Sequence, residues 1–267
     1  MVALPPSGGN GGPPCVPSLC WNVSEPASSP SLPAALEHFG IVLPPPQVDA
    51  LARYCRLLWE WNTRLNLTRH TDYDRFVARD LVDSLAFAEL LEEGERVLDV
   101  GTGGGVPGVV LAIVRPDLRV TLSESVGKKA RAVEAIVRDL ALSAAVYHGR
   151  AEALLDDRLA APPSPAGRAV PPAESGRSAG KPEAAPGDGF DTLLVRAVAP
   201  LPKLLTWFRP RCDAFDRLLV LKGPGWVEER GEARHRGLMH GLALRRRKVY
   251  ATPGTGAQSV LLEIRRR

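Results

Sequence analysis

The 267-residue sequence is poor in cysteine, and its four cysteines form neither a C-x-x-C pair nor a set with histidine at metal-ligand spacing. This pattern argues against a zinc module and against a disulfide framework. We therefore expect no metal and a reducing compartment, the cytoplasm. No apolar run reaches the length of a membrane-spanning helix, and the first residues lack a basic segment followed by an apolar core. We accordingly expect no membrane partner and no secretion signal.

The 30 acidic residues are slightly outnumbered by the 34 lysines and arginines, which gives a net charge of +4 and a pI near 9.0. Such a balance permits a polyanionic partner without requiring one. Pro, Gly and Ser are concentrated in residues 1–30 and in about 158–189, where apolar residues are too few to form a core. We expect a disordered tail over 1–30 and a disordered insertion at about 158–189.

The remaining sequence divides into two regions. Residues 31–94 show apolar residues at helical spacing and predict a small helical cap. One of its helices is expected to be capped by Asp72 or Asp74, to close at Gly94, and to bury a stripe made of Val77, Leu81, Leu85, Ala88 and Leu91. Residues 95–267, apart from the insertion, alternate strands and helices and end in a hairpin. This order predicts an α/β domain with a mainly parallel sheet and an antiparallel last strand.

The best-defined motif is a strand, a glycine loop and the start of a helix over residues 97–108. Glycines at 101, 103 and 105 permit positive φ and let a ligand lie against the backbone. Pro107 suits the first position of a helix, and the apolar residues 109–114 are typical of a helix packed against a sheet. The combination predicts the nucleotide site of a doubly wound, Rossmann-like fold.

Two carboxylates favour S-adenosylmethionine (SAM) over a dinucleotide as the ligand. Asp99 stands at the end of the strand, where it would repel a pyrophosphate but attract the ammonium and sulfonium of SAM. Glu124, at the end of the next apolar strand, is placed to accept hydrogen bonds from ribose hydroxyls. The dinucleotide fingerprint also needs a third glycine where this chain has Val106. The alternatives are a structural turn without a ligand and an NAD site.

Other strand ends supply further candidates, because these ends face the ligand crevice in such sheets. They are Arg150, Ala151, Glu152, Arg196 and Lys222. For Arg150 and Arg196 a structural ion pair with nearby carboxylates is an equal alternative. The chain lacks the Asn/Asp-Pro-Pro-aromatic tetrapeptide of amine methylases. Cys212, the one cysteine of the later core, is better explained by packing than as a nucleophile.

Five segments occur in an order that is specific to one family. They are W-N-x-x-x-N-L-T at 61–68, D-S-L at 83–85, D-V-G-T-G-G-G-V-P-G at 99–108, R-P at 115–116 and L-K-G at 221–223. Together they resemble the RsmG (GidB) family of small-subunit ribosomal RNA guanine-N7 methyltransferases, over roughly residues 35–264. The sequence departs from the family at Asp80, where a histidine is usual, and at Gln258, where an arginine is frequent.

The resemblance implies a class I SAM-dependent methyltransferase domain behind a helical cap. The implied reaction transfers a methyl group from SAM to N7 of a guanine in the 530 loop of 16S ribosomal RNA. Family SAM contacts fall on Gly101, Val106, Ala151, Glu152 and Arg196. To these the strand-end argument adds Asp99, Gly103 and Glu124.

Guanine N7 carries a lone pair, so we expect no catalytic acid or base and mainly a positioning role for the enzyme. The expected substrate is 16S ribosomal RNA or the small ribosomal subunit, bound by a monomer. The candidate RNA contacts are Arg64, Arg69, Arg79, Arg150 and Lys222. The basic run at 245–248 is better explained as exposed surface than as a phosphate contact. Competing functions are methylation of a small molecule or another RNA, an NAD-dependent oxidoreductase, and non-catalytic RNA binding.

Overall fold

The computed structural model describes residues 28–160, 189–253 and 256–267. Residues 1–27 and 161–188, which carry most of the predicted tail and insertion, lie outside this part of the chain, and the domain division stays a prediction. The helical elements are α1 (Leu32–His38), α2 (Pro45–Asn62), α3 (Tyr73–Arg75), the π-helix η1 (Phe76–Leu81), α4 (Val82–Ala88), α5 (Gly108–Val114), α6 (Gly127–Asp139), α7 (Ala151–Ala160), α8 (Leu201–Phe208), the 3₁₀-helix η2 (Arg209–Arg211) and α9 (Trp226–His235). The strands are β1 (Arg96–Val100), β2 (Arg119–Glu124), β3 (Ala144–His148), β4 (Phe190–Arg196), β5 (Phe215–Lys222), β6 (Leu242–Ala251) and β7 (Gln258–Arg266).

In the described residues one sheet has the strand order β3-β2-β1-β4-β5-β7-β6. Strands β1 to β5 are parallel, while β7 runs antiparallel to both β5 and β6. The predicted mainly parallel α/β sheet with an antiparallel end is therefore confirmed. The order of connection reverses between β1 and β4, and that reversal marks where ligands bind in open α/β sheets.

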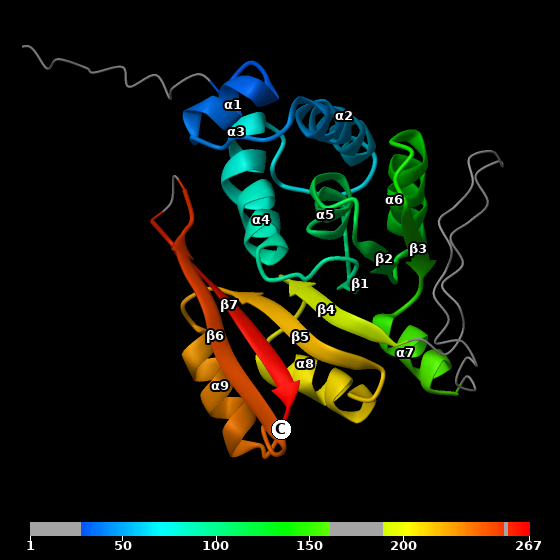
Figure 1. Cartoon of the computed structure of the whole chain (residues 1–267), viewed down its shortest axis with the longest axis vertical. Helices are drawn as coiled ribbons and strands as arrows, with labels where there is room; N and C mark the ends of the chain where they lie inside the picture. The colour runs from blue at the N-terminus through cyan, green and yellow to red at the C-terminus, as the bar shows by residue number, and fades with distance from the viewer. Residues whose placement is uncertain (1–27, 161–188, 254–255) are drawn as a thin grey trace, which may run out of the picture.

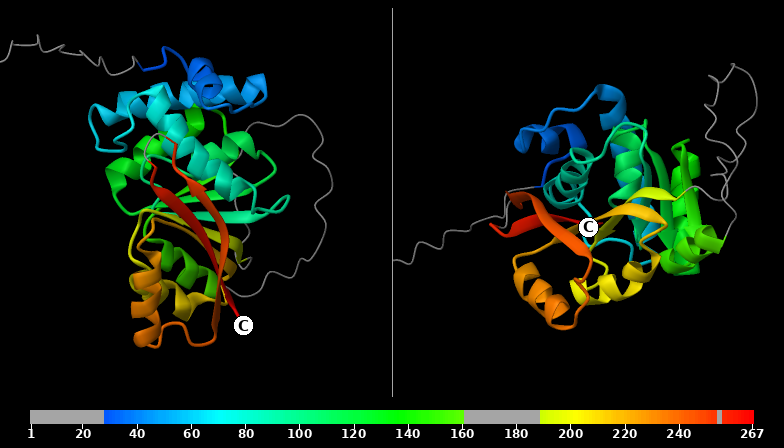
Figure 2. Two further views of the ribbon diagram at one scale, coloured as in Figure 1. Left: turned by 90° about the vertical axis from the view of Figure 1, so that its left-hand side faces the viewer. Right: turned by 60° about the horizontal axis from the view of Figure 1, so that its bottom comes forward.

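Helices cover both faces of the sheet (Figures 1 and 2). Helices α2, α4, α5 and α6 contribute to one hydrophobic cluster, and α7, α8 and α9 contribute to the other. Helix α5 is buried at every one of its residues, as its uniformly apolar sequence requires. It begins at Gly108, so Pro107 is the residue before the helix and not its first member.

The predicted buried stripe of the helix over residues 77–91 is correct at Val77, Leu81 and Leu91, which are buried, and wrong at Leu85 and Ala88. Asp72 caps the segment as expected, through a 2.8 Å bond that its carboxylate accepts from the N–H of Arg75. The π-helix η1 then inserts a wider turn, in which the N–H of Val82 bonds the carbonyl of Val77. As a result Leu85 and Ala88 are only half-buried, whereas Asp80, Asp83 and Ser84 are buried. The α-helix itself ends at Ala88, before the expected Gly94.

The N-terminal helices share a core with the sheet. Leu51 and Leu58 of α2 are fully buried in the same cluster as Val110 of α5 and Leu122 of β2. Trp59 and Trp61 pack half-buried against this cluster. The indole N–H of Trp59 also donates to the carbonyl of His70 at 2.8 Å.

Candidate cofactor site

The glycine loop lies at the reversal point of the sheet, directly after β1. Gly101, Gly103 and Gly105 have φ values of +65°, +61° and +104°, so the loop uses the conformational freedom for which its glycines were singled out. Gly101 is exposed, and a Cβ there would lie 3.4 Å from the side chain of Val198, which follows β4. The ends of β1 and β4 thus meet around an accessible stretch of backbone.

The segment after β4 is strained at the same place. Ala197 has a φ of +56°, a left-handed conformation that costs a residue with a Cβ about 1 kcal/mol or more. Such strain is concentrated at binding and active sites. It supports the assignment of this edge of the sheet as the functional one.

Asp99 lies beneath the loop and holds it in shape. Its Oδ2 accepts a 2.6 Å bond from the hydroxyl of Thr102 and a 2.9 Å bond from the N–H of Gly108. Burial raises the pKa of Asp99 to about 6, against the opposing effect of these two bonds. Asp99 is 1% exposed, and its carboxylate accepts hydrogen bonds from the loop and from the start of α5. It positions the loop, and a direct contact of its carboxylate with SAM stays a prediction.

Glu124 connects the loop to the end of β2. Its two carboxylate oxygens accept bonds from the N–H of Gly103 at 3.1 Å and from the N–H of Val126 at 2.8 Å. The N–H of Gly149, after β3, bonds the carbonyl of Glu124 at 3.0 Å. Three strand ends are therefore tied together at one edge. A carboxylate has lone pairs for further donors, so a ribose contact remains compatible with these bonds.

Helix α2 and the segment that follows it support the glycine loop, a contact that the sequence did not reveal. The hydroxyl of Tyr54 on α2 donates to the carbonyl of Gly104 at 2.9 Å in a buried position. A Cβ on Gly104 would lie 2.9 Å from Leu58 and 3.2 Å from the carbonyl oxygen of Leu67. The W-N-x-x-x-N-L-T segment shapes this contact, because the Asn62 side chain accepts from the N–H of Leu67 at 2.8 Å.

Arg196 ends β4 between two buried carboxylates. Its Nη2 lies 2.7 Å from Asp80 Oδ1 and its Nε lies 2.9 Å from Asp83 Oδ2. Burial disfavours the charge, but the two carboxylates raise the pKa of Arg196 above its usual value. His70 Nδ1 lies 3.0 Å from Asp80 Oδ1, and the hydroxyl of Tyr250 donates to Asp83 Oδ1 at 2.7 Å. The structural ion pair, one of the two alternatives for Arg196, is thus present.

Two comparisons with curated proteins decide the family. A protein named Ribosomal RNA small subunit methyltransferase G from Rhodopirellula baltica is 44% identical over 211 residues, which cover 79% of this chain and 78% of that protein. A protein of the same name from Pseudomonas aeruginosa is 32% identical over 86% of this chain and 92% of that protein. The chain belongs to the ribosomal RNA small subunit methyltransferase G family.

Two further similarities agree with this membership. The GidB family model, described as rRNA small subunit methyltransferase G, matches residues 47–162. A solved structure from Klebsiella pneumoniae, described as a candidate O-methyltransferase, superposes with a TM-score of 0.51 at 14% identity, covering 87% of this chain and 94% of that one. The enzyme is therefore a SAM-dependent methyltransferase with the class I fold, as the sequence predicted.

The residues around the glycine loop of this methyltransferase fit SAM. Exposed backbone at Gly101, half-buried Gly103 and Val106, and the Glu124 carboxylate at the adjacent strand end suit a ligand without phosphates, while Asp99 lies buried beneath the loop and does not offer its carboxylate at the surface. The other predicted contacts follow β3: Ala151 is buried, and the Glu152 side chain lies 4.0 Å from the exposed guanidinium of Arg150. Contacts of these residues with SAM stay predictions.

The predicted RNA contacts fall into two groups in this methyltransferase. Arg64 and Arg69 are exposed in the connection after α2, Arg79 is half-buried on η1, and none of them forms an ion pair within the described residues. Lys222, by contrast, donates to the carbonyl of Ala199 at 2.7 Å and lies 2.8 Å from Glu229. The charge of Lys222 is therefore neutralised within the protein by Glu229.

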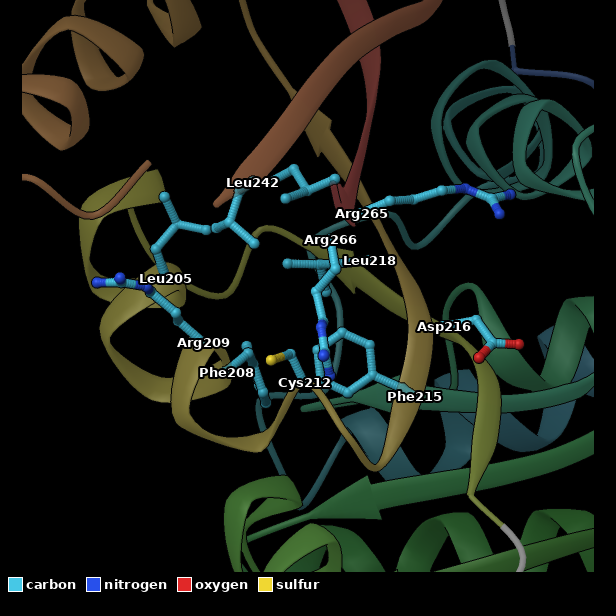
Figure 3. A pocket seen from close by; sticks show the side chains of 11 residues that line it. Leu205, Phe208, Arg209, Cys212, Phe215, Asp216, Leu218, Leu242, Arg265 and Arg266 are labelled. Carbon is cyan, nitrogen blue, oxygen red and sulfur yellow. The ribbon is translucent and has the colours of Figure 1, made fainter. Parts of the chain in front are cut away.

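A cavity of about 20 Å³ lies between α8, β5 and β7, away from the glycine loop (Figure 3). Cys212 and Phe208 line it, and a space of this size holds a single water and no substrate. In the described part of the methyltransferase no group of three or more His, Cys, Asp or Glu side chains is placed to hold a metal ion. The helices described there include none long and apolar enough to cross a membrane.

Proposed function

We propose that this protein transfers the methyl group of SAM to N7 of a guanine in the 530 loop of 16S ribosomal RNA. The observation that carries the proposal is the 44% identity to a small-subunit ribosomal RNA methyltransferase over 79% of the chain. The identity of the base and its loop come from the family resemblance of the glycine and W-N-x-x-x-N-L-T segments.

The chemistry needs little from the protein beyond placement. When bound, SAM supplies a methyl group on a positively charged sulfur. The N7 lone pair of guanine forms the new C–N bond while the C–S bond breaks and sulfur keeps the electron pair. No proton leaves N7, so no general base is required. Holding the two reactants in line can contribute ~7–11 kcal/mol to the lowering of the barrier.

We assign the cofactor to the crevice between the ends of β1, β2, β3 and β4. In this assignment SAM lies against the loop residues Gly101, Gly103 and Val106, and Glu124 has free carboxylate lone pairs for it. On the opposite side of the crevice are Ala151 and Glu152. Arg196 is a positioning residue in this assignment, because its guanidinium is held by Asp80 of η1 and Asp83 of α4.

The target guanine has to be unpaired or extruded to reach the crevice. Exposed Arg64, Arg69 and Arg150, with half-buried Arg79, offer guanidinium groups for the surrounding phosphates. We propose that the enzyme acts as a monomer, in the cytoplasm, on 16S RNA or on the assembled small subunit.

The test is methyl transfer from labelled SAM to small subunits that lack N7-methylguanine, with naked 16S RNA in parallel. The product is mapped by chain cleavage at N7-methylated guanine. The decisive variant is Gly101→Asp, and its matched control is Gly40→Asp. Both glycines have a φ of +65°, so the backbone strain is the same, and only the first change puts a carboxylate into the crevice.

We expect label at one guanine of the 530 loop with the wild type and the control, and none with Gly101→Asp. Label at a guanine elsewhere in the RNA would refute the assigned loop. If SAM binds but no RNA is labelled, the enzyme methylates a small molecule instead.

A further inference from the structure

A second cavity lies between the C-terminal half of α9 and the start of β6. Its volume is about 400 Å³, within the range of small-ligand sites. Figure 1 shows α9 beside β6 at the end of the molecule where the chain terminates. The lining residues are Arg230, Arg234, Gly237, Met239, His240, Leu242, Leu244 and Arg267.

The rim of this cavity is cationic and uncompensated. Three arginines and one histidine line it, and no Asp or Glu side chain is among the described lining residues. Arg230, Arg234 and Arg267 make no ion pair within the part of the chain that the structure describes. Neighbouring arginines differ in this respect: Arg236 pairs with Glu232 at 3.2 Å, and Arg266 pairs with Asp213.

The floor of the cavity is apolar. Leu242 is buried, and Met239 and Leu244 are half-buried. The guanidinium of Arg230 lies 5.0 Å from the ring centre of Trp226, and this cation–π contact holds it in place. An apolar floor beneath a rim of guanidinium groups is complementary to a nucleotide, which combines a flat base with a phosphate.

The cavity lies at the other end of the sheet from the methyl-transfer crevice. Strand β7 connects the two places: Val260 pairs with Lys222 at the crevice end of β5, and Arg266, six residues later, pairs with Leu242 of the cavity. At ~3.3 Å per residue this separation is ~20 Å. A ligand in this cavity is therefore distinct from the reacting base.

We propose that this cavity binds a phosphate-bearing nucleotide of the RNA substrate, about 20 Å from the methylated guanine along the sheet. The proposal rests on the proposed function, since it takes RNA as the substrate. The contact fixes the position of the RNA on the enzyme and contributes affinity without touching the reacting atoms. Arg234, Arg267 and Arg230 bind the phosphate, and the base lies over Leu242 and Leu244.

The test compares two double variants of the full chain. Arg234→Gln with Arg267→Gln removes two rim charges. Arg138→Gln with Arg236→Gln removes the same net charge from an exposed position of α6 and from the exposed residue that follows α9, and neither lines the cavity. Affinity for naked 16S RNA is measured between 50 and 200 mM salt, together with the affinity for SAM and with kcat and KM on small subunits.

We expect the rim variant to raise the Kd for RNA and the KM by about tenfold, with kcat and SAM affinity unchanged. The slope of log affinity against log salt should decrease by about 1.4, since each lost single-strand phosphate contact removes ~0.7. The control variant should keep the wild-type slope within about half of that change.

Three results overturn the proposal. The first is a rim variant that matches the control in RNA affinity and in salt slope while the wild type methylates RNA normally. The second is variant-sensitive binding of inorganic phosphate or GMP without any change in RNA affinity, which assigns the cavity to a free phosphorylated ligand. The third is a loss of affinity for whole subunits alone, which indicates an acidic protein surface. A wild type that neither binds nor methylates RNA refutes the proposed function as well.

Discussion

Replacing Tyr54 with phenylalanine tests whether the cap shapes the cofactor loop. The substitution removes one oxygen from a fully buried side chain and leaves the packing of the ring in place. Its hydroxyl donates to the Gly104 carbonyl at 2.9 Å, so that buried carbonyl loses its partner. An unsatisfied buried acceptor costs about 1–3 kcal/mol. At ~2–4 °C per kcal/mol for a chain somewhat smaller than this one, the melting temperature should fall by several degrees.

The cofactor should also bind more weakly, because the loop no longer has a fixed carbonyl at its centre. If half of the lost free energy appears in binding, the Kd for SAM rises by about twofold to thirteenfold. Isothermal titration with SAM and thermal unfolding measure the two effects. Tyr73→Phe is the matched control, since the Tyr73 hydroxyl makes no hydrogen bond within the described residues.

A Tyr54→Phe enzyme that is destabilised but binds SAM with wild-type affinity would refute this reasoning. The cap would then stabilise the fold without shaping the site. An enzyme with unchanged stability would refute the hydrogen bond itself.

Two other substitutions probe the buried charges. Arg196→Met leaves Asp80 and Asp83 buried without their cation, which should lower the free energy of unfolding, measured by urea denaturation, by about 3–5 kcal/mol. Adding Asp80→Asn and Asp83→Asn should restore most of this loss. A loss below about 1 kcal/mol for Arg196→Met contradicts the ion pairs. Burial raises the pKa of Asp99 to about 6, above its unfolded value near 3.9, so its contribution to stability is complete below about pH 4 and is lost as the pH rises through 6. The stability of wild type relative to Asp99→Asn should therefore fall by ~2 kcal/mol from pH 4 to pH 7, and a constant difference over that range argues against the raised pKa.

The glycine loop and the strands around it could be predicted because their signals are local. Positive φ at Gly101 and Gly103 follows from the residues themselves, and β2 begins and ends at the residues expected. The hairpin of β6 and β7 was likewise indicated by the proline and glycines between them. Short-range rules of turn and strand chemistry determine all of these features.

The helix before β1 could not be predicted in the same way. A helical periodicity assumes 3.6 residues per turn, and the π-helix η1 interrupts it, so the predicted stripe holds at Val77 and Leu81 but fails at Leu85 and Ala88. The stripe did not include Asp80 and Asp83, which are also buried and pair with Arg196. Asp80, noted in the sequence only as a departure from the family's histidine, thereby becomes a central member of a buried network.

Roles that depend on long-range contacts were also missed. Lys222 stands at a strand end like a ligand contact, but Glu229 on α9 neutralises it. Tyr54 has no local signal at all, since its partner Gly104 lies 50 residues further along the chain. Asn62 had one usable signal, its place in the W-N-x-x-x-N-L-T segment.

The contact between α2 and the glycine loop enlarges the part of the sequence in which a single substitution can inactivate the enzyme. Gly104 is confined by Tyr54, Leu58 and Leu67, although these residues precede Gly104 by 37 residues or more. A screen for inactive variants should therefore recover changes in the N-terminal helices beside changes in the glycines. An inactive allele in that region is then no sign of a separate role for the cap.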